Sequence, residues 1–411
     1  MSTTGRDLSR RDFLKTAGAA GIGSLLTATG SLAAKSTELG EKTAGHPLVP
    51  RRPFGKTGVD VSCLSLGGIF DIPSNQLVLR KAMEWGVTYW DTAAGYVGGR
   101  SEIGIGNYFN KHPEARKKVF LVTKSGASST RGMTKHLSRS LERMKTDSID
   151  LYFMHAVSDI DQVDDEMKAW AENAKAQGKI KLFGFSTHSN MEECLLGAAK
   201  LGWVDGIMMT YNYRLMHTDK MREAVDACAK AGIGLTAMKT QAGSVWRRVG
   251  KENQEALSLT ERFMERGFTE EQAKLKAVWE NPTIASICSQ MANLTILGSN
   301  VAAALDKTKL SAGDMKLLDH HARETSADYC AGCTHICESP YGGKVPIGDV
   351  IRYLMYYHSY GECHRARALF AELPSRTRKH MLSSDYSMAE RKCPRGMPIG
   401  ELMKEAARVL A

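Results

Sequence analysis

From residue 58 onward, short apolar runs alternate with segments in which apolar residues recur every three or four positions. The runs predict strands at residues 59–66, 87–91, 118–124, 149–155, 180–186, 206–211, 233–239 and 284–290. The periodic segments predict helices at residues 74–85, 101–110, 134–144, 161–177, 191–201, 218–231 and 269–279. Such alternation is typical of a parallel sheet covered by helices, and about eight units favour a closed (β/α)8 TIM barrel over an open sheet.

The pattern also divides the chain into parts. Residues 35–50 are polar, contain Pro47 and Pro50, and are expected to form a linker. The barrel is expected to span residues 51–312, close to the ~250 residues that such barrels take. Beyond it the strand pattern stops. Residues 313–411 predict a small helical domain with helices at residues 347–357, 366–373, 374–381 and 399–409. The fold class is therefore α/β with a helical appendage.

The N-terminus has the pattern of an export signal. Arg10 and Arg11 precede Phe13 and Leu14, and a weakly apolar stretch rich in small residues follows to residue 34. Paired arginines before such a stretch are typical of the twin-arginine route, so residues 1–34 predict a signal peptide. The prediction implies the twin-arginine export machinery as a partner and a periplasmic location. An ordinary amphipathic helix is the alternative.

The balance of charged residues does not indicate a particular binding partner. Lys and Arg number 55 against 45 Asp and Glu, and the isoelectric point is about 9.0. The basic residues are scattered, and no recognition motif accompanies them, so no nucleic-acid partner is expected. Hydrophobic residues make up 43% and charged residues 24%, which is typical of a folded globular chain.

Polar residues end several predicted strands. In a TIM barrel these ends meet at one face, where the active site lies. The rule selects Asp91, Lys124, His155, Ser186 and Tyr211.

Together with Tyr96, these residues suit one reaction. A carbonyl that accepts hydride develops negative charge on oxygen and needs a proton donor beside it. The Tyr96 phenol can donate that proton, and an ammonium at Lys124 is expected to lower its pKa. An acidic partner at Asp91 would keep Lys124 charged, and a neutral His155 could orient the carbonyl.

The chain resembles the aldo-keto reductase family over about residues 52–300. The resemblance rests on Gly55-Lys56-Thr57-Gly58-Val59, Asp91-Thr92-Ala93 with Tyr96, Ser101-Glu102, Val122-Thr123-Lys124, Asp150-Leu151-Tyr152 with His155, and Gly184-Phe185-Ser186-Thr187-His188. It implies that Tyr96 is the general acid, that Lys124 and Asp91 tune it, and that His155 orients the carbonyl. It also implies that the hydride comes from a nicotinamide cofactor.

The resemblance implies cofactor-binding residues as well. Ser186 and Thr187 match the positions that hold the nicotinamide carboxamide. Tyr211, Met238 and Lys239 match positions beside the ring and the diphosphate. A second set matches the loop that binds the adenosine phosphate: Met291, Asn293 and Asn300. Gln290 replaces a usual glycine there and Ala292 supplies no charge, so both NADP(H) and NAD(H) remain possible cofactors.

Four cysteines in the tail suggest a metal centre. Cys330, Cys333 and Cys337 are clustered, and Cys393 precedes Pro394. In ferredoxins, three clustered thiols and a distant Cys-Pro hold one 4Fe-4S cluster, and the tail resembles the ferredoxin-like domain found on a subset of aldo-keto reductases. Zinc held with His335, His364 or Cys363, disulfides, and a site without metal are the alternatives. Cys363 is also the leading substitute for the fourth cluster ligand. The remaining cysteines are expected to be small buried apolar residues: Cys63, Cys194, Cys228 and Cys288.

The leading functional hypothesis is an NAD(P)-dependent oxidoreductase that acts on a small carbonyl or sugar-like substrate. The alternative is a non-catalytic or electron-transfer protein that uses the barrel as a scaffold and the cluster as a redox centre with an electron-transfer partner. Substrate specificity is expected from the long segment at residues 242–266.

Overall fold

Eight parallel strands close into one barrel in the computed structural model, which describes residues 47–246, 265 and 267–411. In barrel order the strands are β3 (Leu64–Gly67), β4 (Tyr89–Asp91), β5 (Phe120–Ser125), β6 (Ile149–Met154), β7 (Ile180–Thr187), β8 (Gly206–Thr210), β9 (Gly234–Met238) and β10 (Ile284–Gln290). The last strand closes on the first, with Cys288 in register with Ser65. The predicted (β/α)8 barrel is confirmed.

One predicted strand is divided in two. Instead of a single strand at residues 59–66, β2 (Asp60–Ser62) pairs antiparallel with β1 (Arg51–Pro53), and β3 begins only at Leu64. The hairpin carries Phe54, which is fully buried and packs close to Gly206 and Gly234 at the first residues of β8 and β9. The hairpin therefore plugs the N-terminal end of the barrel and leaves the opposite end for a site.

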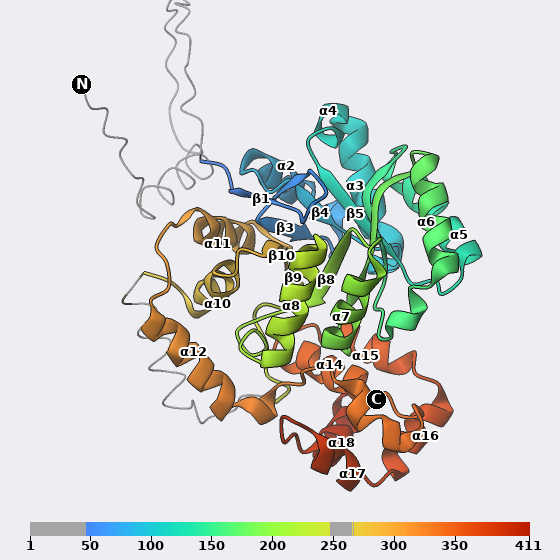
Figure 1. Cartoon of the computed structure of the whole chain (residues 1–411), viewed down its shortest axis with the longest axis vertical. Coiled ribbons are helices and arrows are strands. Elements are labelled where there is room, and N and C mark those ends of the chain that lie inside the picture. Colours follow the sequence, from blue (N-terminus) through green and yellow to red (C-terminus); the bar gives the residue numbers. More distant parts are fainter. Residues whose placement is uncertain (1–46, 247–264, 266) are drawn as a thin grey trace, which may run out of the picture.

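Helices surround the barrel in the expected alternation (Figure 1). They are α2 (Gln76–Glu84), α3 (Arg100–Lys111), α4 (Pro113–Arg116), α5 (Thr130–Met144), α6 (Asp165–Ala176), α7 (Met191–Leu201), α8 (Asp219–Ala231), α10 (Glu270–Trp279) and α11 (Leu294–Leu305). Three short 3-10 turns also follow strands or precede helices: η1 (Ile72–Ser74), η2 (Tyr96–Gly99) and η3 (Ile160–Gln162). Several starts are set by capping side chains, such as Ser129 before α5 and Thr269 before α10.

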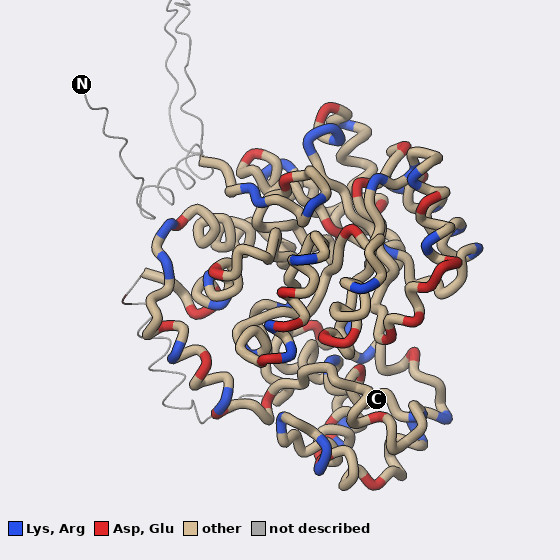
Figure 2. The backbone as a smooth tube through the Cα atoms, viewed as in Figure 1, with Lys and Arg blue, Asp and Glu red and all other residues tan. Residues whose placement is uncertain are grey.

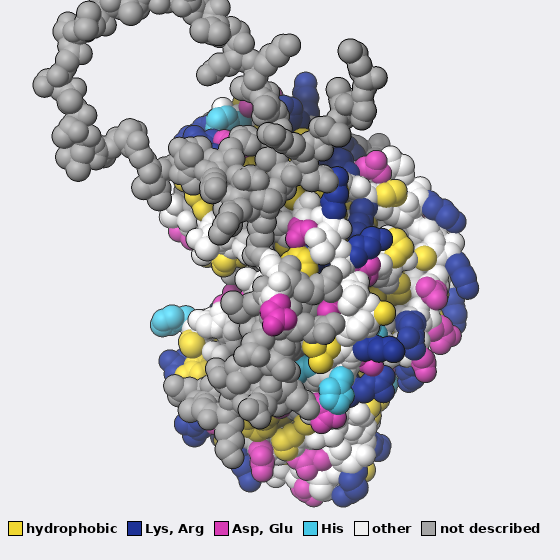
Figure 3. All heavy atoms as spheres, turned by 90° about the vertical axis from the view of Figure 1, so that its left-hand side faces the viewer, with side chains coloured by type: hydrophobic (Ala, Val, Ile, Leu, Met, Phe, Trp, Pro, Cys, Tyr) yellow, Lys and Arg dark blue, Asp and Glu magenta, His cyan; other side chains and the backbone are white. Residues whose placement is uncertain are grey.

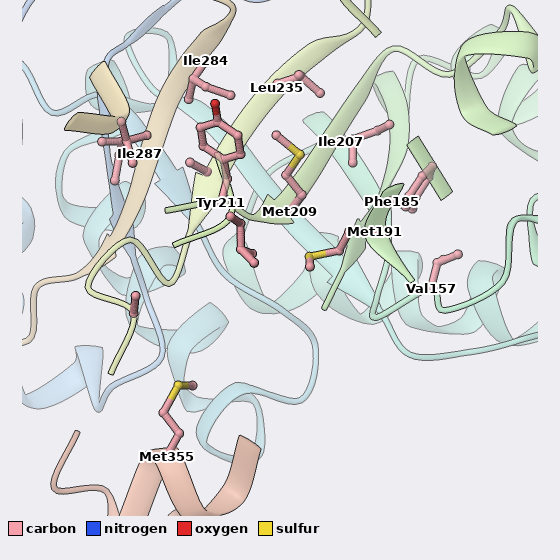
Figure 4. Packing of buried hydrophobic residues seen from close by; sticks show 14 of the residues in the cluster. Val157, Phe185, Met191, Ile207, Met209, Tyr211, Leu235, Ile284, Ile287 and Met355 are labelled. Carbon is pink, nitrogen blue, oxygen red and sulfur yellow. The ribbon is translucent and has the colours of Figure 1, made fainter. Parts of the chain in front are cut away.

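The apolar core has two layers. Inside the barrel, Phe54, Tyr89, Val122, Phe153 and Met208 pack against one another. A larger layer fills the space between strands and helices, where Figure 4 shows Phe185, Ile207, Met209 and Leu235. This arrangement is expected where a parallel sheet is covered by helices, because both faces of each strand are then buried.

Over its described residues the tail consists of helices joined by loops and contains no strand. It contains α12 (Ala312–Glu324), η4 (Ser326–Asp328), α13 (Thr334–Cys337), η5 (Ser339–Tyr341), α14 (Ile347–His358), α15 (Cys363–Ala371), α16 (Ser375–Ser383), α17 (Ser387–Lys392) and α18 (Ile399–Leu410). The helices predicted in this region are present, and α13 and α17 are additional short ones. Among the helices that the structure describes, none is both long and apolar enough to cross a membrane.

The tail docks on the C-terminal end of the barrel (Figure 1). Gly332 O accepts a hydrogen bond of 2.8 Å from Asn190 N after β7, and Tyr329 Oη accepts one of 2.9 Å from Asn212 Nδ2 after β8. Ser359 Oγ donates to Ser244 O after β9 at 2.5 Å. The tail therefore covers the mouth on the side of β7, β8 and β9.

Basic and acidic residues alternate along the surface helices (Figure 2). Many form pairs within one helix, such as Arg323 with Asp319 and Arg408 with Glu405. The face drawn in Figure 3 likewise mixes both signs of charge with small apolar patches. Oppositely charged pairs at this spacing stabilise the helices that carry them.

Candidate active site

A buried ion pair forms the base of the candidate site. Asp91 ends β4 and Lys124 lies on β5, and both side chains are at most 2% exposed. Lys124 Nζ lies 2.6 Å from each carboxylate oxygen of Asp91 and donates a third hydrogen bond of 2.9 Å to Thr92 O. All three ammonium donors are therefore used, as a buried charge requires.

Tyr96 and His155 lie beside this pair. Lys124 Nζ is 5.1 Å from the centre of the Tyr96 ring, and the rings of Tyr96 and His155 are 5.7 Å apart in an edge-to-face arrangement. Tyr96 follows β4 and His155 follows β6. The four residues predicted as catalytic are thus brought together at the ends of three consecutive strands.

The turn that carries Tyr96 is held in place by contacts with a neighbouring helix. Val97, Gly98 and Gly99 have φ values of 51°, 63° and 91°, a region that L side chains rarely adopt. Arg143 of α5 donates to Ala94 O at 2.9 Å and to the buried Glu102 at 3.1 Å. A Cβ at Gly99 would lie 2.4 Å from the Arg143 guanidinium. Arginine and glycine together therefore hold the tyrosine turn in one position.

Lys124 was expected to lower the pKa of Tyr96, but burial has the larger effect on this pKa. Burial raises the pKa of Tyr96, the Lys124 ammonium lowers it by less, and the net pKa is about 12. The prediction of a lowered pKa for Tyr96 was therefore wrong, because burial and the nearby Asp91 carboxylate offset the ammonium. Burial also lowers the pKa of Lys124, but Asp91, Tyr96 and Cys288 together outweigh burial and raise the pKa above its usual value. The lysine stays charged.

His155 is neutral at pH 7. Burial lowers its pKa to about 3, and the positive charges of Lys124, Lys239, Arg365 and Arg352 act in the same direction. A neutral imidazole can donate one hydrogen bond and accept another, so it is suited to orienting a carbonyl oxygen.

Some predicted cofactor residues face the mouth. Ser186 Oγ accepts from Ala156 N at 3.0 Å, and Thr187 Oγ1 donates to Ser189 O at 2.8 Å. Met238 ends β9, and Lys239 after it lies with its Nζ 3.1 Å from His188 Nδ1. Lys239 lines the cavity between the mouth and the tail, whereas the hydroxyls of Ser186 and Thr187 already have protein partners.

The side chain of Tyr211 points away from the tail and into the apolar layer between strands and helices. Its hydroxyl accepts a hydrogen bond of 2.9 Å from Asn281 Nδ2, and its ring lies in the apolar layer beside Ile284 and Leu235, directed away from Met355 of α14 (Figure 4). This geometry does not support the predicted contact between Tyr211 and a cofactor. Its neighbour Asn212 is the residue that turns toward the tail, since it donates to Tyr329 Oη and Lys239 O.

The residues predicted to bind the adenosine phosphate mostly contact other residues of the protein. Met291 is fully buried in the apolar layer, and Asn293 caps α11 by accepting from Ile296 N at 3.0 Å. Asn300 Nδ2 donates to Ser289 Oγ at 3.0 Å. Met291 is therefore a packing residue, while the two asparagines shape the loop after β10.

Sequence reasoning missed several residues of the site. Cys288 was expected to be a small buried apolar residue, yet its thiol donates to Asp91 Oδ2 at 3.6 Å. Its position near the end of the eighth strand was the available signal. Three residues of the tail, Arg352, Tyr356 and Arg365, also reach the mouth, where they act electrostatically on His155 or Lys239. No local pattern marks them, because only the docking of the tail brings them there.

The four predicted metal-binding cysteines surround one cavity. Cys330, Cys333, Cys337 and Cys393 line it together with apolar side chains such as Ile351. Cys363 does not line it, and its thiol donates to Tyr357 O at 3.7 Å.

The chemistry of these thiols limits the alternatives. All nine cysteines are free thiols, so the disulfide alternative has no pair in this structure. Burial raises the pKa of Cys330 to about 11 and that of Cys333 to about 12, so both are protonated at pH 7. Over the residues that the structure describes, no three His, Cys, Asp or Glu side chains converge tightly enough to hold a single metal ion.

Comparison with known proteins adds to this geometry. Residues 67–296 match the sequence profile of the Aldo/keto reductase family. The uncharacterized oxidoreductase YrpG of Bacillus subtilis is 27% identical over 217 residues, which are 47% of this chain and 66% of that protein. Aldo-keto reductase yakc of Schizosaccharomyces pombe, whose name specifies NADP(+), is 32% identical over 154 residues, 34% of this chain and 44% of that protein.

The chain thus spans two thirds or less of the length of these two relatives. Among solved structures, the holo form of aldo-keto reductase AKR11C1 from Bacillus halodurans superposes with a TM-score of 0.55 at 21% identity. The match covers 67% of this chain and 96% of that one. At this identity the likeness shows the fold.

The lowered pKa of His155 predicts how the protein responds to acid. Since the folded protein keeps this ring neutral down to about pH 3, its NMR ring signals should not shift between pH 8 and pH 5. The unfolded chain binds the proton near pH 6.5, so stability should fall as the pH drops below that value. His155→Gln identifies the signals and should make unfolding less sensitive to acid. A His155 titration near pH 6.5 would contradict the buried, neutral ring.

Proposed function

The chain belongs to the aldo/keto reductase family, and we propose that it transfers hydride between a nicotinamide cofactor and a carbonyl–alcohol pair, with Tyr96 as proton donor. The observation that supports this proposal best is the position of Tyr96 and His155 beside the buried Lys124–Asp91 pair at the barrel mouth. Oxidoreductase relatives support the same class of reaction.

Each residue has a defined task in this proposal. When bound, the nicotinamide supplies the hydride in reduction and accepts it in oxidation. As the carbonyl oxygen gains negative charge, the Tyr96 phenol gives it a proton and the Lys124 ammonium stabilises the tyrosinate left behind. The neutral His155 donates a second hydrogen bond to the same oxygen. Because the pKa of Tyr96 is about 12, its proton stays in place until the oxygen becomes basic enough to take it.

The cofactor would lie across the mouth between β7 and β10. The family resemblance assigns Ser186 and Thr187 to the carboxamide and Lys239 to the diphosphate; the first two residues end β7, and Lys239 follows β9. We favour NADP(H), since one relative is named for NADP(+), with NAD(H) as the alternative because Gln290 and Ala292 offer no charge to a 2′-phosphate. A small carbonyl compound or a sugar-like molecule is the proposed substrate.

Replacing Tyr96 tests the proton donor. Tyr96→Phe should lower kcat for carbonyl reduction by about 10²- to 10⁴-fold, because the oxygen loses its acid. Binding of the dinucleotide, followed by nicotinamide fluorescence, should stay within about twofold of the wild type. Tyr108→Phe is the matched control, since Tyr108 packs against Trp90 in the helix layer. Unchanged turnover in Tyr96→Phe would show that another group supplies the proton.

A non-catalytic or electron-transfer protein is the alternative function. The side chains of Asn293 and Asn300, predicted to bind the adenosine phosphate, make structural hydrogen bonds instead. Under this alternative the barrel is a scaffold, and a redox centre in the tail exchanges electrons with a partner. Failure of the purified protein to bind NADPH or NADH in the same fluorescence titration would favour it over the reductase.

We further propose one 4Fe-4S cluster on Cys330, Cys333, Cys337 and Cys393. The support is that all four thiols face one cavity. A zinc ion would need its ligands to converge at ~2.3 Å from one point, whereas thiols spread around a larger space suit a cluster. Iron would replace the protons of these thiols, so the metal would also give partners to polar groups that line an apolar wall.

Removing one thiol tests the cluster. Protein purified without oxygen should absorb near ~400 nm and carry about four iron atoms per chain. Cys337→Ala should lose most of both signals, because a cavity ligand is missing. Cys228→Ala is the control, since Cys228 is buried on α8 away from the cavity. Zinc or no metal in wild-type protein prepared in this way would overturn the cluster.

Export by the twin-arginine route remains a proposal. The predicted signal at residues 1–34 and most of the linker lie outside the described residues, as does most of the segment at 242–266. The route suits a protein that acquires its cofactors before export.

Changing Arg10 and Arg11 to lysine should leave the precursor unprocessed in the cytoplasm, because this route depends on the arginine pair. The same change at Arg51 and Arg52, another arginine pair, is the control. Cell fractionation followed by immunodetection measures the outcome. Normal processing of the Arg10/Arg11 variant would contradict export by the twin-arginine route.

A further inference from the structure

A second cavity lies at the joint between the barrel mouth and the tail. The barrel supplies Lys239 and His188 to its wall, and the tail supplies Arg352 and Met355 of α14 together with Tyr329. Figure 4 shows Met355 rising from the tail toward the barrel. Neither chain segment forms this cavity alone, so its chemistry could not follow from the barrel fold.

Three cations gather around one tyrosine at this joint. Lys239 Nζ lies 5.6 Å from the centre of the Tyr356 ring, and the Arg365 guanidinium lies 4.6 Å from it. Arg352, one helical turn before Tyr356, lines the cavity directly.

The acidic partners of these cations lie outside the cavity wall. Arg352 pairs with Asp349 at 2.6 Å and Arg365 with Glu362 at 2.5 Å, each within its own helical segment. Asp349 is 41% exposed, and neither carboxylate lines the cavity. After burial, the groups that act most strongly on the pKa of Lys239 are Tyr356, Arg352 and Arg365, and its Nζ lies 3.1 Å from Nδ1 of the neutral His188. The joint therefore has an excess of positive charge.

The ionisation of neighbouring groups agrees with this excess. Burial lowers the pKa of Lys239, and Arg352 and Arg365 lower it further. Burial alone would raise the pKa of Tyr356, but the three cations outweigh burial and lower it. Lys239, Arg365 and Arg352 also lower the pKa of His155, so their field covers the space beside the proposed proton donor. An anion bound at the joint would favour the charged form of Lys239 and so oppose the lowering of its pKa.

We infer that Arg352 of the tail binds the carboxylate of the substrate, within the positive field to which Lys239 adds, which makes the substrate a carbonyl compound that carries a carboxylate. The inference rests on the proposed function for the position of the carbonyl at Tyr96 and His155. The planar guanidinium of Arg352 suits a carboxylate because its remaining donors can bind both oxygens. The tail would thus select the substrate, while the barrel performs the reaction.

Binding of a non-reacting acid tests this site without requiring turnover. Benzoate should bind the full-length protein in calorimetry, and the neutral benzamide of the same shape should bind at least about tenfold more weakly. Arg352→Met should weaken benzoate binding by about tenfold or more, and Arg352→Lys should weaken it less. Arg376→Met is the control, since Arg376 is exposed on α16 and away from the cavity.

Two results would overturn the inference. One is equal binding of benzoate and benzamide to the wild type, which needs no variant to fold. The other is an Arg352→Met protein, intact by thermal unfolding, that binds benzoate normally or loses NADPH binding instead, which would assign the cations to the cofactor phosphates. If benzoate binds as expected but neither dinucleotide binds, the anion site stands and the reductase proposal fails.

Discussion

The ion pair between Lys124 and Asp91 is the constraint on which the mouth of the barrel depends. Both groups are almost fully removed from water, and the ammonium has all three donors satisfied by Asp91 and Thr92 O. Loss of one partner of such a pair typically costs ~3–5 kcal/mol, because the other charge is left buried and alone. The pair therefore ties the ends of β4 and β5 together and keeps a fixed positive charge beside the phenol of Tyr96.

Burial changes what that charge can do. An ammonium beside a phenol in water would lower the pKa of the phenol, but burial of Tyr96 removes the solvation that tyrosinate needs. The pKa of Tyr96 consequently rises to about 12 while that of His155 falls to about 3, so both groups are neutral before any substrate arrives. A mouth with neutral donors and a fixed cation is prepared for negative charge that develops only during hydride transfer.

The two cavities of the tail are neighbours. Cys330, Ala331 and Ile351 line both the thiol cavity and the joint cavity, and Arg352 is the next residue after Ile351. The thiol cavity and the wall that carries Arg352 are therefore coupled through shared residues. Under the proposal of a cluster on these thiols, the cluster would also help to order that wall.

By itself, the sequence determined the barrel and most of its catalytic end. The period of apolar residues is a local property, each strand and helix is built from consecutive residues, and neighbouring parallel strands end at the same face. Asp91, Lys124 and His155 could be placed together for that reason. Only the tertiary structure decided the rest. The direction of Tyr211, the contact of Cys288 with Asp91 and the arrival of Arg352 at the mouth depend on how distant segments pack. The ionisation of Tyr96 was decided in the same way, because burial is the sum of contacts that no single segment contains.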